Sequence, residues 1–163
     1  MIKTAILTIS DKGSKGERED VTGPSVKKTL SPNEYYVDYY KIIPDELNII
    51  VKELQYLCDN SKVDLVLTNG GTGFSKRDIT PEATQKVIEK YVPGISEAMR
   101  MKSLDITPKA MLSRGISGIR NNTLIINLPG SPKAAIENLN FVLPALKHGI
   151  EILKGEASEC AVK

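Results

Sequence analysis

Apolar residues fall along this chain in two patterns, short continuous runs and longer segments with helical spacing. Residues 3–10 and 63–68 are short apolar runs of the kind that form strands buried on both faces of a sheet. Residues 34–43 are rich in β-branched and aromatic residues between two prolines, and they predict another strand rather than a base-stacking platform of tyrosines. Two further strands are predicted, joined by a turn at residues 120–122: residues 113–119 and 123–127.

Segments with apolar residues at i, i+3 and i+4 predict the helices. One is opened by Pro44-Asp45-Glu46, since proline and acidic residues suit the first turn of a helix. Another is capped by Thr80-Pro81 and carries Tyr91 on its apolar face. The last begins at Ser131-Pro132, and Pro144 inside it is expected to kink or split it. The apolar stripes and the proline, glycine and capping residues around them predict these approximate helical ranges: residues 21–30, 47–58, 83–91, 95–104 and 136–153.

Strands that alternate with helices predict an α/β protein whose sheet is mainly parallel and covered on both faces. Ligands bind such sheets outside the carboxyl ends of the strands, near a topological switch point. A polar, charged loop is predicted from Asp11 to Asp20. Three informative segments lie at predicted strand ends, and they are Ser10-Asp11, residues 68–73 and residues 128–133. We therefore expect these segments to converge on one ligand site.

The bulk composition limits the classes of protein to consider. The chain of 163 residues has the size of one domain, and we treat residues 1–163 as a single unit. A net charge of +2 without a Lys/Arg block gives no reason to expect nucleic acid as a partner. No stretch reaches the ~20 apolar residues that cross a membrane, and the N-terminus enters a strand rather than a secretory signal. Cys58 and Cys160 lack a metal or redox spacing, as expected for plain thiols of a cytoplasmic protein.

The most distinctive segment is the glycine turn Gly70-Gly71-Thr72-Gly73, between a predicted strand and a predicted helix. Glycines let a ligand approach the backbone and leave amide donors unobstructed, so such a turn suits a phosphate. The turn matches neither the P-loop nor the dinucleotide pattern, and a tight strand-to-helix connection explains it about equally well. The charged sequel Ser75-Lys76-Arg77-Asp78 favours a charged ligand.

Two acidic residues, Asp45 and Asp78, stand near predicted strand ends. Each could serve only its neighbouring helix, as a residue of the first turn or as a cap. As a pair they could share Mg²⁺ with a triphosphate, because Mg²⁺ takes one or two protein carboxylates and completes its shell with phosphate oxygens and water. Both interpretations stay open at the level of the sequence.

Other candidates are weaker. Pro129-Gly130-Ser131-Pro132-Lys133 is either a well-capped turn or a second set of helix N-terminal amides, with Lys133 directed at a phosphate. Ser113-Arg114 is either a strand start or a pocket wall in which Arg114 grips an anion. The single histidine, His148, lies late in a helix, which argues against a histidine-centred triad or metal site.

These segments, in this order, resemble the molybdenum-cofactor biosynthesis family that includes MogA and MoaB. The most specific part is the glycine turn followed by Arg77-Asp78-Ile79-Thr80-Pro81-Glu82-Ala83, and the resemblance covers nearly the whole chain. Asn69 departs from a threonine seen in many members, and Ser131 stands at a variable position. The remaining matching segments are Ser10-Asp11, Ile43-Pro44-Asp45, Met111-Leu112-Ser113-Arg114 and Asn127-Leu128-Pro129-Gly130-Ser131-Pro132-Lys133.

The resemblance implies a Rossmann-like three-layer α/β/α domain that assembles as a homotrimer. It implies that the terminal phosphate of molybdopterin attacks the α-phosphorus of ATP, pyrophosphate leaves, and the product passes toward a molybdate-inserting enzyme. The two essential acidic positions of the family match Asp45 and Asp78, as catalytic residues and Mg²⁺ ligands. The family positions near nucleotide or pterin match Ser10, Asp11, Gly70, Gly71, Thr72, Gly73, Ser113, Arg114, Pro129, Gly130, Ser131 and Lys133.

Two functions of different classes follow from this resemblance. The first is a molybdopterin adenylyltransferase, which fits a sequence without an activated nucleophile because phosphoryl-type transfer depends on positioning and charge neutralisation. The second is a non-catalytic MoaB-type protein that binds molybdopterin or acts as a scaffold. The short tail after Gly155 leaves no room for a partner-binding domain, which disfavours the scaffold. An unrelated nucleotide-binding enzyme remains only if the motif match is accidental.

Overall fold

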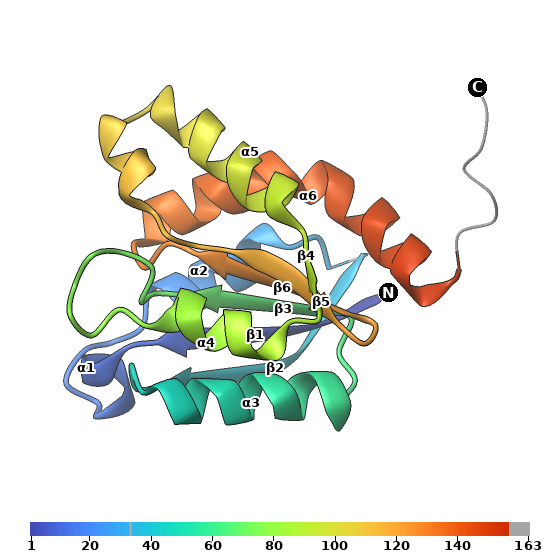
Figure 1. Cartoon of the computed structure of the whole chain (residues 1–163), viewed down its shortest axis with the longest axis horizontal. Coiled ribbons are helices and arrows are strands. Elements are labelled where there is room, and N and C mark those ends of the chain that lie inside the picture. The colour runs from blue at the N-terminus through green and yellow to red at the C-terminus, as the bar shows by residue number, and fades with distance from the viewer. Residues whose placement is uncertain (33, 157–163) are drawn as a thin grey trace.

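A computed structural model describes residues 1–32 and 34–156 of the chain, so Cys160 and the rest of the tail lie outside the described residues. The strands form one sheet in the order β2-β1-β3-β6-β5-β4 (Figure 1). Strands β2, β1, β3 and β6 run parallel, while β5 and β4 continue the sheet antiparallel. The strands have these bounds: β1 (Ile2–Ile9), β2 (Tyr35–Ile43), β3 (Leu65–Asn69), β4 (Lys90–Tyr91), β5 (Ser117–Arg120) and β6 (Thr123–Leu128). The mainly parallel sheet predicted from the sequence is confirmed.

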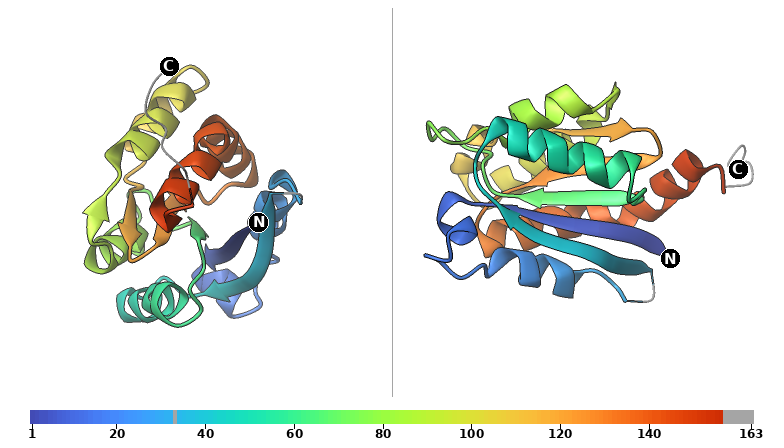
Figure 2. Two further views of the ribbon diagram at one scale, coloured as in Figure 1. Left: turned by 90° about the vertical axis from the view of Figure 1, so that its right-hand side faces the viewer. Right: turned by 90° about the horizontal axis from the view of Figure 1, so that it is seen from below.

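Helices cover both faces of this sheet, which gives the predicted three-layer α/β/α arrangement (Figures 1 and 2). Helices α2, α5 and α6 pack on one face, and α3 and α4 pack on the other. The short α1 lies at the end of β1, and a 3-10 helix, η1, follows α5. The helices have these bounds: α1 (Asp11–Ser14), α2 (Thr22–Thr29), α3 (Leu47–Asp59), α4 (Thr80–Val87), α5 (Pro93–Leu104), η1 (Pro108–Leu112) and α6 (Pro132–Lys154).

The central strands supply both halves of the core. Ile6 and Leu7 are neighbours in β1 and both are fully buried, but they belong to opposite hydrophobic clusters. Val66 and Leu67 divide in the same way in β3. Because successive strand residues point to opposite faces, a strand covered on both sides must be apolar throughout. This is why β1 and β3 appear in the sequence as continuous apolar runs.

The structure corrects the predicted path of the chain after α4. Helix α4 ends at Val87, and Tyr91 does not lie on it but in the edge strand β4, opposite Gly118 of β5. Residues 113–116 are not part of a strand either, because η1 ends at Leu112, the next four residues have no regular secondary structure, and β5 begins only at Ser117. The helical spacing that placed Tyr91 on α4 does not decide its structure. Residues 90–91 instead pair with β5, where they gain cross-strand hydrogen bonds.

Predictions about helix ends also need correction. The predicted polar loop after β1 begins with α1, whose N-cap Ser10 accepts a hydrogen bond through Oγ from the Gly13 amide at 3.0 Å. Helix α3 begins after Glu46, so Asp45 does not lie in its first turn. Helix α6 continues through Pro144 as one helix and is not split there. None of the described helices is both long and apolar enough to span a membrane.

Candidate functional site

The carboxyl ends of β1, β3 and β6 surround one open cavity of about 640 Å³. Strand β1 pairs with β2 on one side and with β3 on the other, so the topological switch point lies between β1 and β3. The three predicted segments meet at this cavity, because Ser10, Gly70, Gly71 and Gly130 all line it. The expected convergence of strand ends is therefore confirmed.

The first two glycines of the turn have backbone conformations that require glycine. Gly70 and Gly71 have φ values of +100° and +66°, in the region that side chains rarely adopt. A Cβ atom on Gly70 would lie 2.3 Å from the carbonyl oxygen of Ile9, and one on Gly71 would lie 2.3 Å from Oγ1 of Thr80. The turn therefore packs directly against the end of β1 and the start of α4.

Hydrogen bonds fix this turn on both sides. The Gly70 amide donates to the carbonyl of Leu128 at 3.2 Å, which ties β3 to the end of β6. Thr80 Oγ1 donates to the Gly70 carbonyl at 2.9 Å, and the Thr80 amide donates to the Gly71 carbonyl at 3.1 Å. Thr80 is the first residue of α4 and is fully buried, so the start of this helix fixes the turn from inside the protein. The glycine turn is thus a rigid part of the cavity wall.

Asp78 lines the cavity and closes the loop that follows the glycine turn. Its Oδ2 accepts hydrogen bonds from the amides of Gly73 at 3.0 Å and Ser75 at 3.1 Å. It does not cap α4, because the N-cap of that helix is Ile79 and makes no side-chain cap bond. The structure therefore does not support the alternative in which Asp78 serves only the helix.

Asp45 lines the same cavity from the connection between β2 and α3. Its Oδ2 accepts a hydrogen bond from the Asp11 amide at 2.9 Å, and the Asp45 amide donates to Asp11 Oδ1 at 3.1 Å. Burial raises the pKa of the Asp45 carboxyl, and the negative charges of Asp11 and Asp78 act in the same direction. The two acidic residues that the sequence singled out therefore meet at one cavity.

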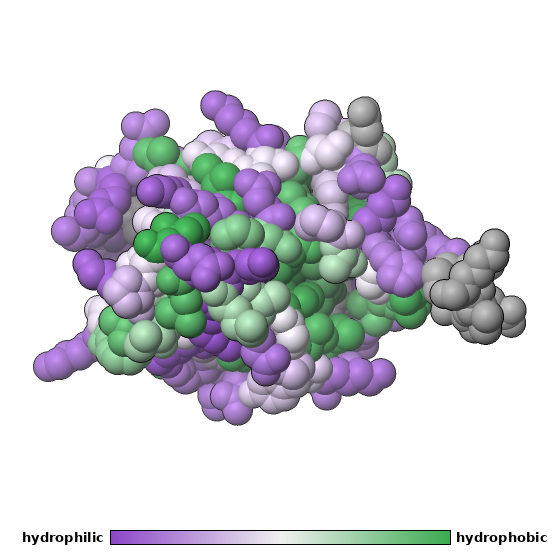
Figure 3. Space-filling model, turned by 90° about the horizontal axis from the view of Figure 1, so that it is seen from above, coloured by the Kyte–Doolittle hydropathy of each residue, from purple (hydrophilic) through white to green (hydrophobic). Residues whose placement is uncertain are grey.

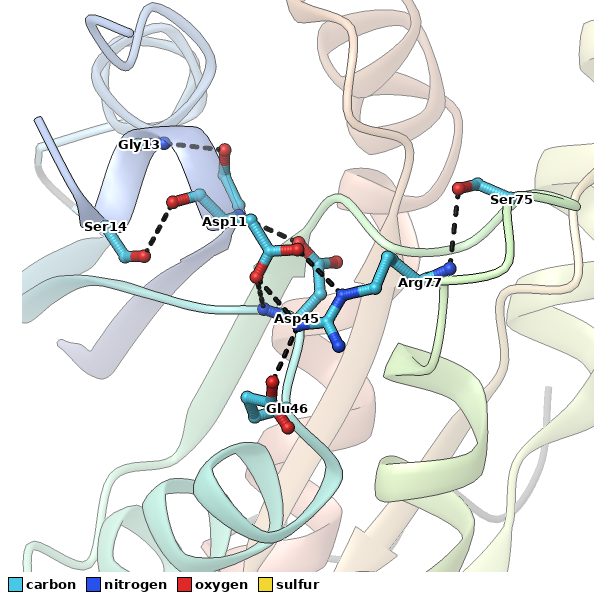
Figure 4. A network of polar contacts seen from close by, with 8 residues as sticks. Asp11, Gly13, Ser14, Asp45, Glu46, Ser75 and Arg77 are labelled. Atoms are coloured by element: carbon cyan, nitrogen blue, oxygen red, sulfur yellow. Dashed lines mark hydrogen bonds and ion pairs between the residues drawn. The ribbon is translucent and has the colours of Figure 1, made fainter. Parts of the chain in front are cut away.

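Asp11 faces a cation as well as Asp45 (Figure 4). Arg77 Nε donates to Asp11 Oδ2 at 2.9 Å, and Arg77 Nη2 donates to Asp11 Oδ1 at 3.0 Å and to Glu46 Oε1 at 2.7 Å. The bond from Arg77 lowers the pKa of the Asp11 carboxyl, and both carboxylates raise the pKa of the guanidinium. Asp11 does not itself line the cavity among the described residues.

Arg114 contacts the glycine loop rather than the first cavity. Its Nε donates to the Gly73 carbonyl at 2.7 Å, its Nη2 donates to the Asp78 carbonyl at 3.0 Å, and its Nη1 forms an ion pair with Glu82. The backbone amide of Arg114 also donates to the Thr72 carbonyl at 2.9 Å. Arg114 therefore fixes the loop between the glycine turn and Asp78.

A second cavity of about 260 Å³ lies on the other side of the glycine turn. Thr72, Gly73, Ser113 and Pro129 line it, so these four predicted residues lie apart from the Asp45 group. Apolar side chains such as Leu112 line it together with polar and charged ones, among them Arg100 and Glu137. Most of the predicted site residues therefore divide between two cavities that share one glycine turn, whereas Asp11 and Arg114 line neither cavity among the described residues.

The segment after β6 is a capped turn with an exposed lysine. Ser131 is the N-cap of α6, and its Oγ accepts a hydrogen bond from the Ala134 amide at 3.3 Å. Gly130, Ser131 and Pro132 line the first cavity, but Lys133 lines neither cavity among the described residues. The Lys133 side chain is 80% exposed and lies 3.9 Å from Glu137. The structure does not bring Lys133 together with the two acids.

Asp20 is a functional candidate that the sequence reasoning missed. It lines the first cavity, and its Oδ1 accepts from the amides of Thr22 at 2.9 Å and Gly23 at 3.0 Å. Its Oδ2 accepts from the hydroxyls of Thr8 at 2.5 Å and Tyr40 at 2.6 Å. Four donors thus hold this carboxylate in the lining of the cavity. An aspartate two residues before the start of a helix was the available signal.

The charge of the first cavity is unusual for a phosphate site. Its lining includes four acidic residues and a single cation, Arg18, within the described part of the chain. Backbone amides offer donors for phosphate oxygens, but the carboxylates repel an unaccompanied polyanion. The four acidic lining residues are Glu19, Asp20, Asp45 and Asp78. A triphosphate fits this cavity best together with a divalent cation.

A three-layer α/β/α domain with a glycine-rich turn and two carboxylates at one cavity beside its switch point defines a class of ligand-binding α/β domains. Within this class, the chain belongs to the family described as the probable molybdopterin binding domain, whose pattern matches residues 5–148.

Known relatives agree with this assignment. The molybdopterin adenylyltransferase of Helicobacter pylori (strain ATCC 700392 / 26695) is 48% identical over 158 residues, which cover 94% of this chain and 89% of the relative. The molybdopterin adenylyltransferase of Escherichia coli K12 is 40% identical, with 91% of this chain and 80% of the relative covered. The crystal structure of MoaB from Thermus thermophilus matches with a TM-score of 0.91 and 46% identity, covering 98% of this chain and 100% of that one.

Proposed function

We propose that this protein is a molybdopterin adenylyltransferase, which transfers AMP from Mg-ATP to the terminal phosphate of molybdopterin in molybdenum-cofactor biosynthesis. The observation that carries the proposal is the meeting of Asp45 and Asp78 in one cavity beside the glycine turn. Relatives with high coverage that bear this enzyme name support it. The reacting phosphate oxygen forms a bond to the α-phosphorus of ATP, the bond to the bridging oxygen breaks, and pyrophosphate leaves.

The residues of the first cavity fit a magnesium ion that arrives with ATP. Asp45 and Asp78 supply the hard oxygen ligands that Mg²⁺ prefers, and the phosphates and water supply the rest of its shell. The described residues contain no cluster of three metal-ligating side chains, which suits an ion that depends on its substrate for ligands. Bound Mg²⁺ supplies positive charge to the phosphate oxygens.

Backbone amides and hydroxyl groups of the chain position the nucleotide. The glycine turn, through the Gly71 amide, and the cap region Gly130-Ser131 offer donors to the nucleotide phosphates, and Ser10 adds a hydroxyl at the end of β1. Holding two phosphate groups in line supplies much of the rate enhancement, because such transfers need little covalent help from the protein. The proposed binding set also includes Pro129, which lines the second cavity, and Asp11 and Lys133, which line neither cavity among the described residues.

We assign the pterin to the second cavity. The exposed surface of its lining is mostly apolar, as a heterocycle requires, and the polar side chains around it include Ser113 and Thr72. Gly71 borders the first cavity and Gly73 borders the second, so the glycine turn separates the two substrates by a few residues. Arg114 supports this turn and adds positive charge near the terminal phosphate of the pterin.

We further propose that the chain, as one domain of residues 1–163, forms a cytoplasmic homotrimer that hands its product to a molybdate-inserting enzyme. The free thiol of Cys58 suits a reducing compartment. The surface over α5 and α6 carries apolar side chains among charged ones (Figure 3), and association would cover some of them. The exposed large apolar side chains on α5 and the segment after it are Met101, Leu104, Ile106, Met111 and Leu112. Light scattering measures the mass of the particle in solution and so tests whether the chain forms a trimer.

The deciding experiment measures pyrophosphate release from ATP and Mg²⁺ with freshly prepared molybdopterin, against a control without pterin. Release that depends on pterin, with adenylylated pterin recovered by mass spectrometry, establishes the transferase. Pterin binding without any release would make the chain a non-catalytic binding protein. Release without pterin would instead identify hydrolysis of ATP to AMP and pyrophosphate, with water as the acceptor, and contradict the proposal.

A further inference from the structure

Arg77 is the cation at the centre of a network that joins three separate connections of the fold (Figure 4). It belongs to the loop that carries Asp78, and its guanidinium bonds Asp11 at the start of α1 and Glu46 at the start of α3. We propose that Arg77 is a positioning residue that sets the arrangement of the Asp45 and Asp78 carboxylates. This inference rests on the proposed function, since it assumes that the two carboxylates serve metal-bound nucleotide.

The contacts indicate that Arg77 acts through Asp11 rather than on the ligand. Both carboxylate oxygens of Asp11 accept from Arg77, at 2.9 Å and 3.0 Å, which is the bidentate geometry that an arginine fork favours. A further bond joins Nη2 to Glu46 at 2.7 Å. Arg77 is not among the described residues that line the first cavity. Its donors are therefore directed at the protein.

Asp11 transmits this restraint to Asp45. Each of the two residues donates its backbone amide to the carboxylate of the other, at 2.9 Å and 3.1 Å. This reciprocal pair brings two negative charges close together, and such an arrangement needs a neighbouring cation. Arg77 supplies that charge on the outer side of Asp11, which leaves Asp45 on the side of the cavity. Without Arg77, we expect Asp11 to turn toward water and release Asp45.

The same residue also links Asp45 to Asp78. Arg77 precedes Asp78 in the chain, and Asp78 Oδ2 is fixed by the amides of Gly73 and Ser75. The guanidinium therefore anchors the Asp78 loop to the connection that carries Asp45. Removing a residue that orients metal ligands in this way typically changes metal affinity by about 10- to 100-fold.

The test compares Arg77→Gln with Arg77→Lys and with a matched control, Arg120→Gln. Arg120 forms a similar bidentate pair with Asp59, at 2.9 Å and 2.7 Å, and neither residue lines the first cavity. The readout is Mn²⁺ binding in the presence of a non-hydrolysable ATP analogue, followed by electron paramagnetic resonance. We expect Arg77→Gln to weaken this binding by about 10- to 100-fold and Arg77→Lys by less, with Arg120→Gln unchanged. In turnover, the KM for Mg²⁺ should rise more than kcat falls.

A double-variant cycle separates action through Asp11 from direct contact with the ligand. If Arg77 acts through Asp11, Arg77→Gln should weaken Mn²⁺–nucleotide binding little further in an Asp11→Asn background. Full additivity of the two losses would overturn the proposal, as would unchanged binding in Arg77→Gln. A wild type that binds Mn²⁺–nucleotide but releases no pyrophosphate would contradict the proposed adenylyltransferase activity. The binding measurements on the Arg77 variants would still test the positioning role. A wild type that binds no metal–nucleotide would overturn both.

Discussion

At the scale of single residues, Gly71 joins backbone conformation to the chemistry of the site. Its φ of +66° already disfavours a side chain, and a Cβ atom would lie 2.3 Å from Thr80 Oγ1 and 3.0 Å from Asp45 Oδ1. We therefore predict that Gly71→Ala lowers the free energy of unfolding by about 1–3 kcal/mol and abolishes Mg-ATP binding. Urea unfolding and calorimetry measure the two effects.

Gly149→Ala is the matched control for Gly71→Ala. Gly149 lies within α6, and a Cβ atom there would meet no neighbouring atom within 4 Å. Alanine is favoured over glycine in a helix interior by up to ~1 kcal/mol, so this variant should be as stable as the wild type or more so. Equal stability of the two variants would show that the glycine turn tolerates a side chain.

The role of Asp78 predicts a loss of activity larger than the loss of stability. Asparagine keeps one oxygen for the amides of Gly73 and Ser75, so Asp78→Asn should stay folded, with a loss of about 1–2 kcal/mol at most. Pyrophosphate release should fall roughly 100-fold or more, because the charge at the cavity is removed. Asp38→Asn, on the exposed surface of β2, should retain full release. Normal release from Asp78→Asn would refute its catalytic assignment.

The sequence predicted some of these residues better than others, and the reason is distance along the chain. The glycine turn and Asp78 lie within a few residues, so local pattern was enough to associate them. Arg77 is 66 residues from Asp11 and 31 from Glu46, and no local pattern joins them. Asp20 offered a local signal just before α2, but its bonds to Thr8 and Tyr40 join two different strands and leave no local pattern.

At the scale of elements, the buried strands and amphipathic helices were predictable, while the edge strand β4 was not. Strand β3 is apolar because both of its faces are buried, and α3 shows its stripe because only one side faces the core. Strand β4 has just two residues, both exposed, so burial left no pattern to detect. Its existence depends on the antiparallel partner β5, which the sequence does not place next to it.

Helix α6 gives a prediction at this scale. Pro144 lies inside the helix and cannot donate to the carbonyl of Asn140, yet α6 is continuous. Pro144→Ala restores that donor, so it should raise the free energy of unfolding by about 1–3 kcal/mol, measured by urea titration. Pro132→Ala is the control, because proline at the start of a helix loses no intrahelical bond and alanine should bring no gain there. Unchanged or reduced stability of Pro144→Ala would contradict this account.

At the scale of the whole molecule, the charged residues at the two ends of the sheet have different roles. The carboxyl end gathers glycines and acids around the first cavity, and the Asp45 carboxyl there has a raised pKa because it is partly buried. Arg120 is the last residue of β5, at the opposite end, where it pairs with Asp59 and lowers the pKa of that carboxyl. Charge is placed for ligand binding at one end and for stability at the other.

This division predicts how stability depends on pH. Because the folded pKa of Asp59 lies below the ordinary value of 3.8, its pairing contributes fully above that pH and is lost as the pH falls through the folded pKa. The stability gap between wild type and Arg120→Gln should therefore be largest at about pH 5–7 and shrink toward roughly pH 3, in urea titrations at each pH. Arg100→Gln is the control: Arg100 donates to the Gly115 carbonyl at 2.7 Å, a group that does not titrate, so its gap should stay constant. A gap for Arg120→Gln that is equally constant would mean that Arg120 stabilises the chain by packing and by its bond to the Val87 carbonyl, not by its charge.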